Sequence, residues 1–286
     1  MKKVLITGGD GVLAEYIKNA FKNFVLFSPN HQELDITNKK AVQNFFKKNN
    51  PNTVIHLAAK TNVDECEKNP NDAFLINSQG TKNIAEACKR NNAFLVYIST
   101  AAVFNGKKDI YYEEDEKDPL NVYGKSKLLG ENHIQEILNK FLIIRAAWLI
   151  GGGKKEKKFI SYILDQLFKG AREIKAVNDK LGTLTYAKEL AGVIKKFIAE
   201  GKTGVYHFGS IGVCSRFDMA SKVISSVGKE VKLIPVSSSY FSNTFSAPRP
   251  DREAIGSKKI EFLNSWEKSL EEYLHSEILP QYSNVK

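Results

Sequence analysis

The sequence predicts an α/β fold of the doubly wound class, in which helices cover both faces of a parallel sheet. Strongly apolar runs such as "KVLIT" (3–7) and "FLVYIST" (94–100) alternate with stretches whose apolar residues recur every three or four positions. A glycine-rich turn directly follows the first of these runs. Continuous apolar strands separated by amphipathic helices are typical of a sheet that is buried on both faces.

The alternation can be followed over the first 150 residues. The expected strands are 3–7, 24–28, 53–59, 94–100 and 140–147. The expected helices run from about 12 to 22, over 39–49, from about 72 to 91, and from Tyr123 onward, where apolar residues with helical spacing are Leu128, Leu129, Ile134, Ile137 and Leu138.

After about residue 150 the pattern becomes looser. A three-glycine turn (151–153) precedes an expected helix over 159–170 and a strand–helix pair over 181–198, while 204–209 and a helix after Ser215 are expected to return to the sheet. The segment 231–254 is rich in loop residues and contains three of the eight prolines. We expect 151–181 and 229–286 to form a smaller substrate-binding lobe, with about 182–228 belonging to the first domain.

Composition excludes several classes of protein. A chain of 286 residues with 42% hydrophobic content can bury a large core. The stretch "FLIIRAAWLIG" is shorter than the roughly 18 residues of a membrane span and contains Arg145, so no span is predicted. The start "MKKVLITGG" is expected to be a strand and not a signal peptide. Three cysteines without a C-x-x-C spacing predict neither disulfides nor a zinc site, which fits a cytoplasmic protein.

The formal net charge of +10 favours an anionic partner, such as nucleic acid, an acidic membrane or a phosphorylated metabolite. The densest basic cluster is "KKEKK" (154–158), and no aromatic residue or nucleic-acid motif accompanies it. We therefore expect a solvated loop or helix start there and no nucleic-acid partner.

The turn "ITGGDGVLAEYI" places Gly8, Gly11 and Ala14 in a G-x-x-G-x-x-A pattern between the first strand and the first helix. Such a turn lets the backbone approach a pyrophosphate, whose charge is met by the free N–H groups of the helix. A tight turn without a ligand is the alternative. The context predicts that residues 1–150 form a Rossmann-type dinucleotide-binding domain, with NADPH or NADH as the cofactor.

The end of the second strand bears on the choice of cofactor. Sites for NAD commonly place an acid there for the ribose 2′-hydroxyl, but this chain has Ser28 in "LFSPNHQ". A missing carboxylate removes repulsion against a 2′-phosphate, although no arginine is present either. NADPH and NADH both remain open, and Asp35, the nearest acid, could contact the adenine.

The stretch "NVYGKSKLLGE" (121–131) contains a candidate catalytic pair. If Tyr123 opens a helix, Lys127 lies on the same face and Lys125 points away. A cation beside a phenol lowers its pKa from about 10, which helps proton exchange near neutral pH. Thr100 ends a strand whose carboxyl end faces the ligand crevice, so its hydroxyl could meet the same substrate oxygen.

Several segments resemble, in order, those of the dTDP-4-dehydrorhamnose reductase family of extended short-chain dehydrogenase/reductases. They are "LDITN", "VIHLAAKTNVDECEKNP", "INSQGTKNIAEAC", "YISTAAVFNG", "PLNVYGKSKLLGE", "IIRAAWLIG", "VNDKLGTLTYAKELA" and "GVYHFGSIGVCSRFDMA". The resemblance covers nearly the whole chain and is weaker from about 230 onward, where "APRPDREAIGSKKI" keeps the outline of a proline-rich substrate loop.

The resemblance implies a role for each residue that matches the family's motifs. The implied cofactor contacts are Gly8, Gly11, Val12, Leu13, Asp35, Ile36, Ala58, Ala59, Lys60, Tyr123 and Lys127. The implied substrate contacts are Thr100, Ala101 and Trp148. Trp148 could equally pack in the core, as aromatic residues at strand ends often do.

The chain departs from the family's pattern in two places. The family usually has S-T-D-Y-V-F where this chain has Ser99 to Phe104 with Ala101 and Ala102 in the middle, so a carboxylate and an aromatic hydroxyl are missing. Some members bind Mg²⁺ through glutamates at a dimer contact, and Tyr16 occupies a position matched to one of them. No metal is therefore predicted.

The leading hypothesis is an NAD(P)H-dependent reductase of the C4 keto group of a 4-keto-6-deoxy nucleotide sugar, acting in deoxysugar and polysaccharide precursor biosynthesis. One alternative is a nucleotide-sugar epimerase with tightly bound NAD, because epimerases often carry small residues beside the threonine. Another is a non-catalytic dinucleotide-binding regulatory subunit. Relatives are often dimers, so the resemblance also allows a homodimer.

Two histidines and one asparagine could have structural roles and not catalytic ones. His56 and His207 lie in apolar strands, which predicts hydrogen-bonded core histidines and not catalytic ones. Asn77 could hydrogen-bond the backbone near the active site or cap its own helix.

Overall fold

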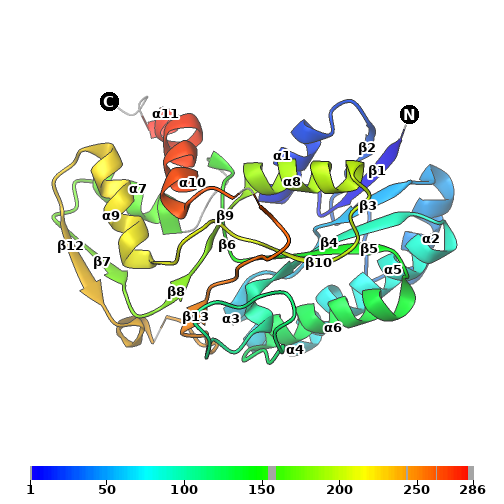
Figure 1. Ribbon diagram of the computed structural model, residues 1–286, viewed down its shortest axis with the longest axis horizontal. Coiled ribbons are helices and arrows are strands. Elements are labelled where there is room, and N and C mark those ends of the chain that lie inside the picture. The colour runs from blue at the N-terminus through cyan, green and yellow to red at the C-terminus, as the bar shows by residue number, and fades with distance from the viewer. Residues whose placement is uncertain (1, 154–158, 243, 262, 283–286) are drawn as a thin grey trace.

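The computed structural model describes residues 2–153, 159–242, 244–261 and 263–282. The lysine-rich run 154–158, expected to be a solvated loop or helix start, lies outside these residues. Figure 1 shows a large parallel sheet with its helices, built mostly from the N-terminal half of the chain. A second, smaller group of helices and strands lies at the other end of the molecule.

Six parallel strands form the large sheet in the order β10-β5-β4-β3-β1-β2. Their bounds are β1 Lys3–Thr7, β2 Val25–Phe27, β3 Thr53–His56, β4 Phe94–Thr100, β5 Phe141–Ala146 and β10 Gly204–Phe208. From β1 the chain runs to β2 on one side, and then through β3, β4, β5 and β10 on the other side, so the strand order reverses between β1 and β3, as in a doubly wound sheet. The predicted fold class is therefore confirmed.

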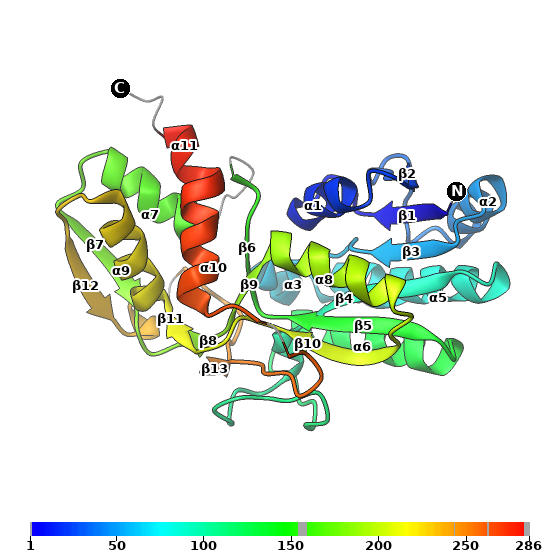
Figure 2. The same cartoon turned by 45° about the horizontal axis from the view of Figure 1, so that its top comes forward.

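Helices cover both faces of this sheet (Figure 2). One face is covered by α1 Val12–Ala20 and α8 Ala187–Ala199, and the other by α2 Lys39–Asn49, α5 Thr81–Arg90 and α6 Val122–Ile137. Successive strand residues pack on opposite sides, so Val4 and Ile6 join the core under α1 whereas Leu5 joins the core under α5. This double burial explains why the strands are continuously apolar.

The remaining elements build the second group and the connections. The short helices near the large sheet are α3 Val63–Lys68, α4 Pro70–Phe74, a π-helical segment Leu75–Gly80 and a 3₁₀ turn Ala101–Val103. The other strands are β6 Trp148–Ile150, β7 Glu173–Val177, β8 Leu181–Gly182, β9 Leu184–Tyr186, β11 Cys214–Ser215, β12 Lys232–Val236 and β13 Arg252–Glu253. The other helical segments are α7 Phe159–Phe168, α9 Arg216–Val227, a 3₁₀ turn Ser238–Phe241, α10 Trp266–Tyr273, a π-helical segment Leu274–Ile278 and α11 Leu279–Tyr282.

The structure differs from the predicted elements at several boundaries. The second strand covers only Val25–Phe27 and the third ends at His56, because residues 57–60 leave the sheet at its carboxyl edge. The helix expected from about 72 to 91 begins at Pro70 and passes through the π-helical segment Leu75–Gly80. The segment 231–254, predicted as loop-rich, contains strand β12, which pairs with β7.

The two segments that were expected to return to the large sheet, 204–209 and the helix after Ser215, pack in different places. Strand β10 joins the large sheet beside β5, as expected for 204–209. Helix α9, which was expected to return to the sheet, instead contributes Met219, Ala220 and Val223 to a second core with α7 and α10. The division into a domain of 1–150 and a lobe of 151–181 and 229–286 stays a prediction.

The cysteines and helices agree with the compositional predictions. Cys66, Cys88 and Cys214 are free and buried. Among the described residues, every helix is too short or too polar to cross a lipid bilayer.

Candidate active site

The predicted catalytic residues meet where β4 ends and α6 begins. Asn121 precedes α6, and its side-chain oxygen accepts a hydrogen bond from Gly124 N at 2.8 Å. A Cβ atom on Gly124 would lie 2.1 Å from the Ala102 carbonyl oxygen, so only glycine lets the helix approach the turn after β4 so closely. This approach places the Thr100 side chain near enough to the Tyr123 phenol to act on its pKa.

The environment of Tyr123 keeps its phenol protonated. Burial raises the pKa of Tyr123 to about 12, and the polar side chain of Thr100 opposes that shift. The negative charge of Glu253 raises the pKa further. A phenol with this pKa carries its proton at neutral pH and can donate it.

Lys127 lies one turn after Tyr123 and is buried, whereas Lys125 is exposed, as predicted from helical geometry. Lys127 Nζ donates to the Ile98 carbonyl at 2.7 Å and lies 4.0 Å from the centroid of the Tyr97 ring. Burial lowers the pKa of Lys127 to about 7. The expected lowering of the phenol's pKa by this lysine was wrong, because the amine is directed at the Ile98 carbonyl of β4.

The glycine turn is shaped by contacts that exclude side chains. Gly8 has φ +69°, and a Cβ atom there would lie 2.9 Å from the Ala58 backbone. A Cβ atom on Gly9 would lie 2.4 Å from the carbonyl oxygen of Ser28. Helix α1 begins after Gly11 without a side-chain cap, which leaves its first N–H groups for an anion.

The other predicted cofactor residues line the same carboxyl edge of the sheet or its core. The Asp35 carboxylate accepts hydrogen bonds from Thr37 N and Oγ1, at 2.9 and 2.7 Å. Leu13 and Ile36 are buried in the two cores, so their backbones and not their side chains are available to a ligand. Val12, Ala58, Ala59 and Lys60 are half-buried.

Ser28 is the residue that replaces the acid at the end of β2. Its hydroxyl is buried and, within the described part of the chain, has no hydrogen-bond partner. It lies against Gly9 of the glycine turn. An unpaired buried hydroxyl beside a turn that is open only to glycine fits a polar ligand such as a dinucleotide.

Asn77 links the cofactor side of the site to the catalytic helix. Its amide group pairs with Lys60, accepting from the backbone N at 2.7 Å and donating to the carbonyl at 3.0 Å. Asn77 Nδ2 also donates to Ser126 Oγ at 3.0 Å, and Ser126 donates to the Tyr123 carbonyl at 2.8 Å. Of the two roles left open for Asn77, the backbone contact near the site is the one observed.

His56 and His207 are core histidines, as predicted. His56 is fully buried between Thr7 Oγ1 at 2.6 Å and Thr81 Oγ1 at 3.1 Å, and burial lowers its pKa to about 3. His207 is fully buried too, and burial and the Arg145 charge lower its pKa. Arg145 itself forms a buried ion pair with Glu131 at 2.7 Å.

Trp148 stands at the start of β6, half-buried, with its ring held on three sides. Its Nε1 donates to Glu253 Oε2 at 2.7 Å, and the Arg216 guanidinium carbon lies 4.0 Å from the ring. A Cβ atom on Gly182 would lie 2.7 Å from the ring, so the indole rests on the β8 backbone. Ala101 is buried in the 3₁₀ turn after Thr100 and offers no side-chain polar atom.

Glu253 and Arg216 were not singled out from the sequence. Glu253 lies on β13, which pairs with β8, and Arg216 opens α9 after β11. Both reach Trp148 only through the small sheet β11-β8-β13. A two-residue strand in a proline-rich segment carries no periodic signal that could have identified Glu253.

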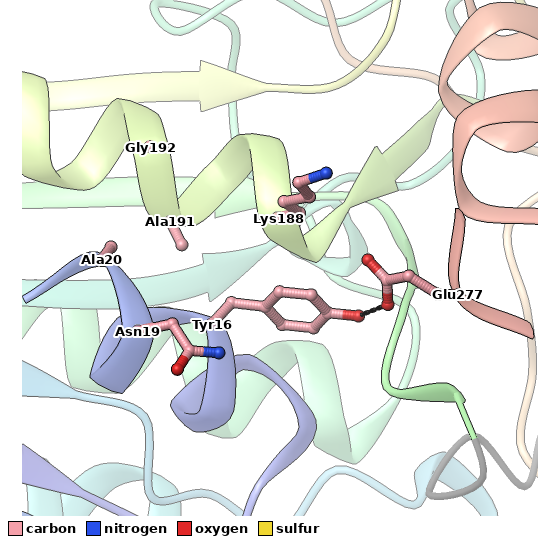
Figure 3. Close-up of a pocket in the computed structure, with 7 residues that line it drawn as sticks. All are labelled: Tyr16, Asn19, Ala20, Lys188, Ala191, Gly192 and Glu277. Atoms are coloured by element: carbon pink, nitrogen blue, oxygen red, sulfur yellow. Dashed lines mark hydrogen bonds between the residues drawn. The ribbon is translucent and has the colours of Figure 1, made fainter. Parts of the chain in front are cut away.

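A separate pocket of about 510 Å³ lies between α1, α8 and the C-terminal π-helical segment (Figure 3). Tyr16 Oη donates to Glu277 there and accepts a hydrogen bond from Gly152 N at 2.6 Å. Tyr16 is the residue matched to a metal-binding glutamate. Across residues 2–153, 159–242, 244–261 and 263–282, no three His, Cys, Asp or Glu side chains gather to hold a metal ion.

A doubly wound sheet, a glycine turn before its first helix and a Tyr-x-x-x-Lys pair at the carboxyl edge together define an extended short-chain dehydrogenase/reductase. The model of the family "RmlD substrate binding domain" matches residues 1–278. The chain belongs to this family, which is that of the dTDP-4-dehydrorhamnose reductases.

Individual relatives match over almost their full length. The spore coat polysaccharide biosynthesis protein SpsK of Bacillus subtilis is 33% identical, over 96% of this chain and 97% of its own. A crystal structure of the Yersinia enterocolitica dTDP-4-dehydrorhamnose reductase is 37% identical with a TM-score of 0.90, covering 96% of this chain and 99% of the other. The Bacillus anthracis dTDP-4-dehydrorhamnose reductase in complex with NADP is 34% identical with a TM-score of 0.91, covering 96% and 100%.

Proposed function

We propose that this protein reduces the C4 keto group of a 4-keto-6-deoxy nucleotide sugar with NADPH or NADH, as a dTDP-4-dehydrorhamnose reductase does. The observation that carries the proposal is the Thr100 side chain next to the Tyr123 phenol, where β4 ends and α6 begins. Relatives with this name that match most of the chain support the same activity.

The residues that would hold the cofactor come from four segments. Gly8 and Gly11 would let the pyrophosphate approach the start of α1, and Ser28 would face the adenosine ribose. Val12, Leu13, Asp35, Ile36, Ala58, Ala59 and Lys60 would complete the contacts. When bound, the reduced nicotinamide supplies the hydride.

Tyr123 would donate its proton to the sugar oxygen as that oxygen becomes an alkoxide. The raised pKa keeps the proton on the phenol until the oxygen is basic enough to take it. Thr100, whose side chain is near enough to act on the phenol, would hydrogen-bond the same oxygen and orient the carbonyl. Trp148, at the start of β6, would contact the sugar as well.

Lys127 would act on the cofactor side of the phenol. Its Nζ donates to the Ile98 carbonyl, and a rotation of the flexible side chain would direct the amine to the ribose hydroxyls. An ammonium group there would also stabilise the phenolate that remains after proton transfer.

The test is oxidation of NADPH or NADH by the purified protein with a panel of dTDP- and UDP-linked 4-keto-6-deoxy sugars. We expect one reduced cofactor to be consumed per sugar reduced, with rapid cofactor exchange. Absence of turnover with every sugar would contradict the proposal. A cofactor that stays bound through turnover, with no net consumption, would support the epimerase alternative instead.

We also propose the cytoplasm as the compartment and a homodimer as the assembly. Three free, buried cysteines suit a reducing compartment. The dimer rests only on the family resemblance, and light scattering of the purified protein at micromolar concentration tests it. A mass near that of one 32.1 kDa chain would contradict it.

A further inference from the structure

We infer that Glu253 determines substrate specificity by accepting a hydrogen bond from a sugar hydroxyl on the carbon next to the keto group. The inference rests on the proposed function, because it places the sugar between Tyr123 and Trp148. It concerns a carboxylate that stands on a proline-rich segment far along the chain from both residues.

The backbone of Glu253 is held rigidly. Strand β13 pairs in parallel with β8, with Glu253 opposite Gly182. The next two residues, Ala254 and Ile255, are buried, and Tyr111 bonds to both sides of Ile255 through Ala254 O and Gly256 N at 2.9 Å each. A carboxylate on so firmly held a strand is suited to read one position of a ligand.

Only one oxygen of this carboxylate has a hydrogen-bond partner among the described residues. Glu253 Oε2 accepts from Trp148 Nε1 at 2.7 Å, and the side chain is half-buried. A carboxylate offers about four acceptor positions, so Oε1 is available to a ligand hydroxyl. The indole bond fixes the carboxylate's orientation and leaves that oxygen free.

The position of Glu253 follows from its bond to Trp148, the residue proposed to contact the sugar. The Trp148 indole donates to Glu253 at 2.7 Å, and Trp148 itself follows β5, the strand beside the one that Thr100 ends. In the turn that follows Thr100, Ala101 and Ala102 supply no side-chain acceptor. A hydroxyl adjacent to C4 would therefore find its acceptor on β13 and not on the turn after β4.

Burial makes such an acceptor selective. Closure of the sugar over Trp148 would remove water from Oε1, and a ligand without the hydroxyl would leave that charge unpaired. A hydrogen bond to a charged group contributes about 1.5–3 kcal/mol, which corresponds to roughly a 10- to 150-fold preference.

The experiment compares two dTDP-linked 6-deoxy sugars, one with a hydroxyl at C3 and one with hydrogen there. Binding is measured by calorimetry and turnover by cofactor oxidation, for wild type, Glu253→Ala, Glu253→Gln and the exposed-carboxylate control Glu230→Gln. We expect Glu253→Ala to weaken the C3-hydroxyl ligand roughly 10- to 100-fold and the C3-deoxy ligand less than about threefold.

Glu253→Gln distinguishes recognition of the sugar hydroxyl from the role of Glu253 in holding the Trp148 ring. The amide oxygen of the glutamine can still accept the hydrogen bond from Trp148 Nε1. We expect it to retain binding of the C3-deoxy ligand and to lose part of the preference for the hydroxyl. Equal weakening of both ligands in Glu253→Ala, or an unchanged preference, would overturn the inference. Wild type that binds both sugars without turning over their keto forms would instead contradict the proposed function, while the binding preference would still decide the role of Glu253.

Discussion

The side-chain nitrogen of Lys127 lies 4.0 Å from the centroid of the Tyr97 ring and donates to the neighbouring Ile98 carbonyl. A buried amine in this position loses hydration that an aromatic face and one carbonyl only partly replace. Its pKa consequently falls from 10.5 to about 7. The residue proposed to support Tyr123 thus titrates in the range where the enzyme would work.

The first prediction concerns pH dependence. A lysine with a lowered pKa is protonated below about 7 and loses its charge as the pH rises, whereas Tyr123, with a pKa of about 12, stays protonated. We expect kcat/KM for the cofactor, which reports the free enzyme, to fall above about pH 7. Lys127→Arg keeps its positive charge over this range, so any residual activity of the variant should not fall above about pH 7. A flat wild-type profile up to about pH 10 would exclude the assignment.

The second prediction concerns the phenol. Tyr123→Phe removes the proton donor and leaves the ring, so we expect kcat to fall by about 10²- to 10⁴-fold with little change in cofactor affinity. Tyr162→Phe, which removes a hydroxyl from an exposed tyrosine, is the matched control and should retain full activity. Activity of Tyr123→Phe within a few-fold of wild type would contradict the proposed mechanism.

The third prediction uses two glycines with nearly the same backbone conformation. Gly8 has φ +69° beside the Ala58 backbone, whereas Gly201 has φ +66° and open space where a Cβ atom would lie. Alanine at either position costs about 1–2 kcal/mol of folding free energy from the left-handed conformation alone. We expect only Gly8→Ala to weaken NADPH binding, by at least about tenfold, measured by fluorescence titration. Equal affinities for the two variants would argue against a pyrophosphate at this turn.

The fourth prediction concerns the buried ion pair. Arg145→Met leaves the Glu131 carboxylate without its partner, so we expect the free energy of unfolding to fall by about 3–5 kcal/mol. The control is Lys232→Met, which breaks an exposed pair with Glu173 and should cost at most about 1 kcal/mol. Denaturant unfolding measures both. Replacing Glu131 by Leu in the Arg145→Met background should restore part of the loss.

The fifth prediction concerns acid stability. The pKa of His56 is lowered from its ordinary value of 6.5 to about 3 in the folded protein. Between these two pH values the unfolded chain binds a proton at this residue and the folded chain does not. Stability should therefore fall as the pH drops from about 6.5 towards 3, by on the order of 3–5 kcal/mol from this residue. His56→Asn, although less stable at neutral pH, should show a weaker dependence over that range. The same slope in both proteins would contradict this origin.

Local patterns in the sequence were sufficient for the frame of the fold. The apolar runs placed all six strands of the large sheet, with errors of a few residues at their ends, and the four-residue spacing from Tyr123 selected Lys127 over Lys125. These features depend on the periods of helix and strand, which neighbouring residues express directly. The π-helical segment Leu75–Gly80 was missed because its sequence also fits an ordinary helix.

What only the tertiary structure decided are contacts between residues far apart in the chain. The sequence by itself established the class of fold, the glycine turn and the Tyr123–Lys127 pair. It did not place Glu253 beside Trp148, 105 positions away, nor direct Lys127 towards Tyr97. Those relationships arise because packing brings the ends of distant strands together and removes water from them. Burial then shifts the pKa of each group, which residue type alone does not determine.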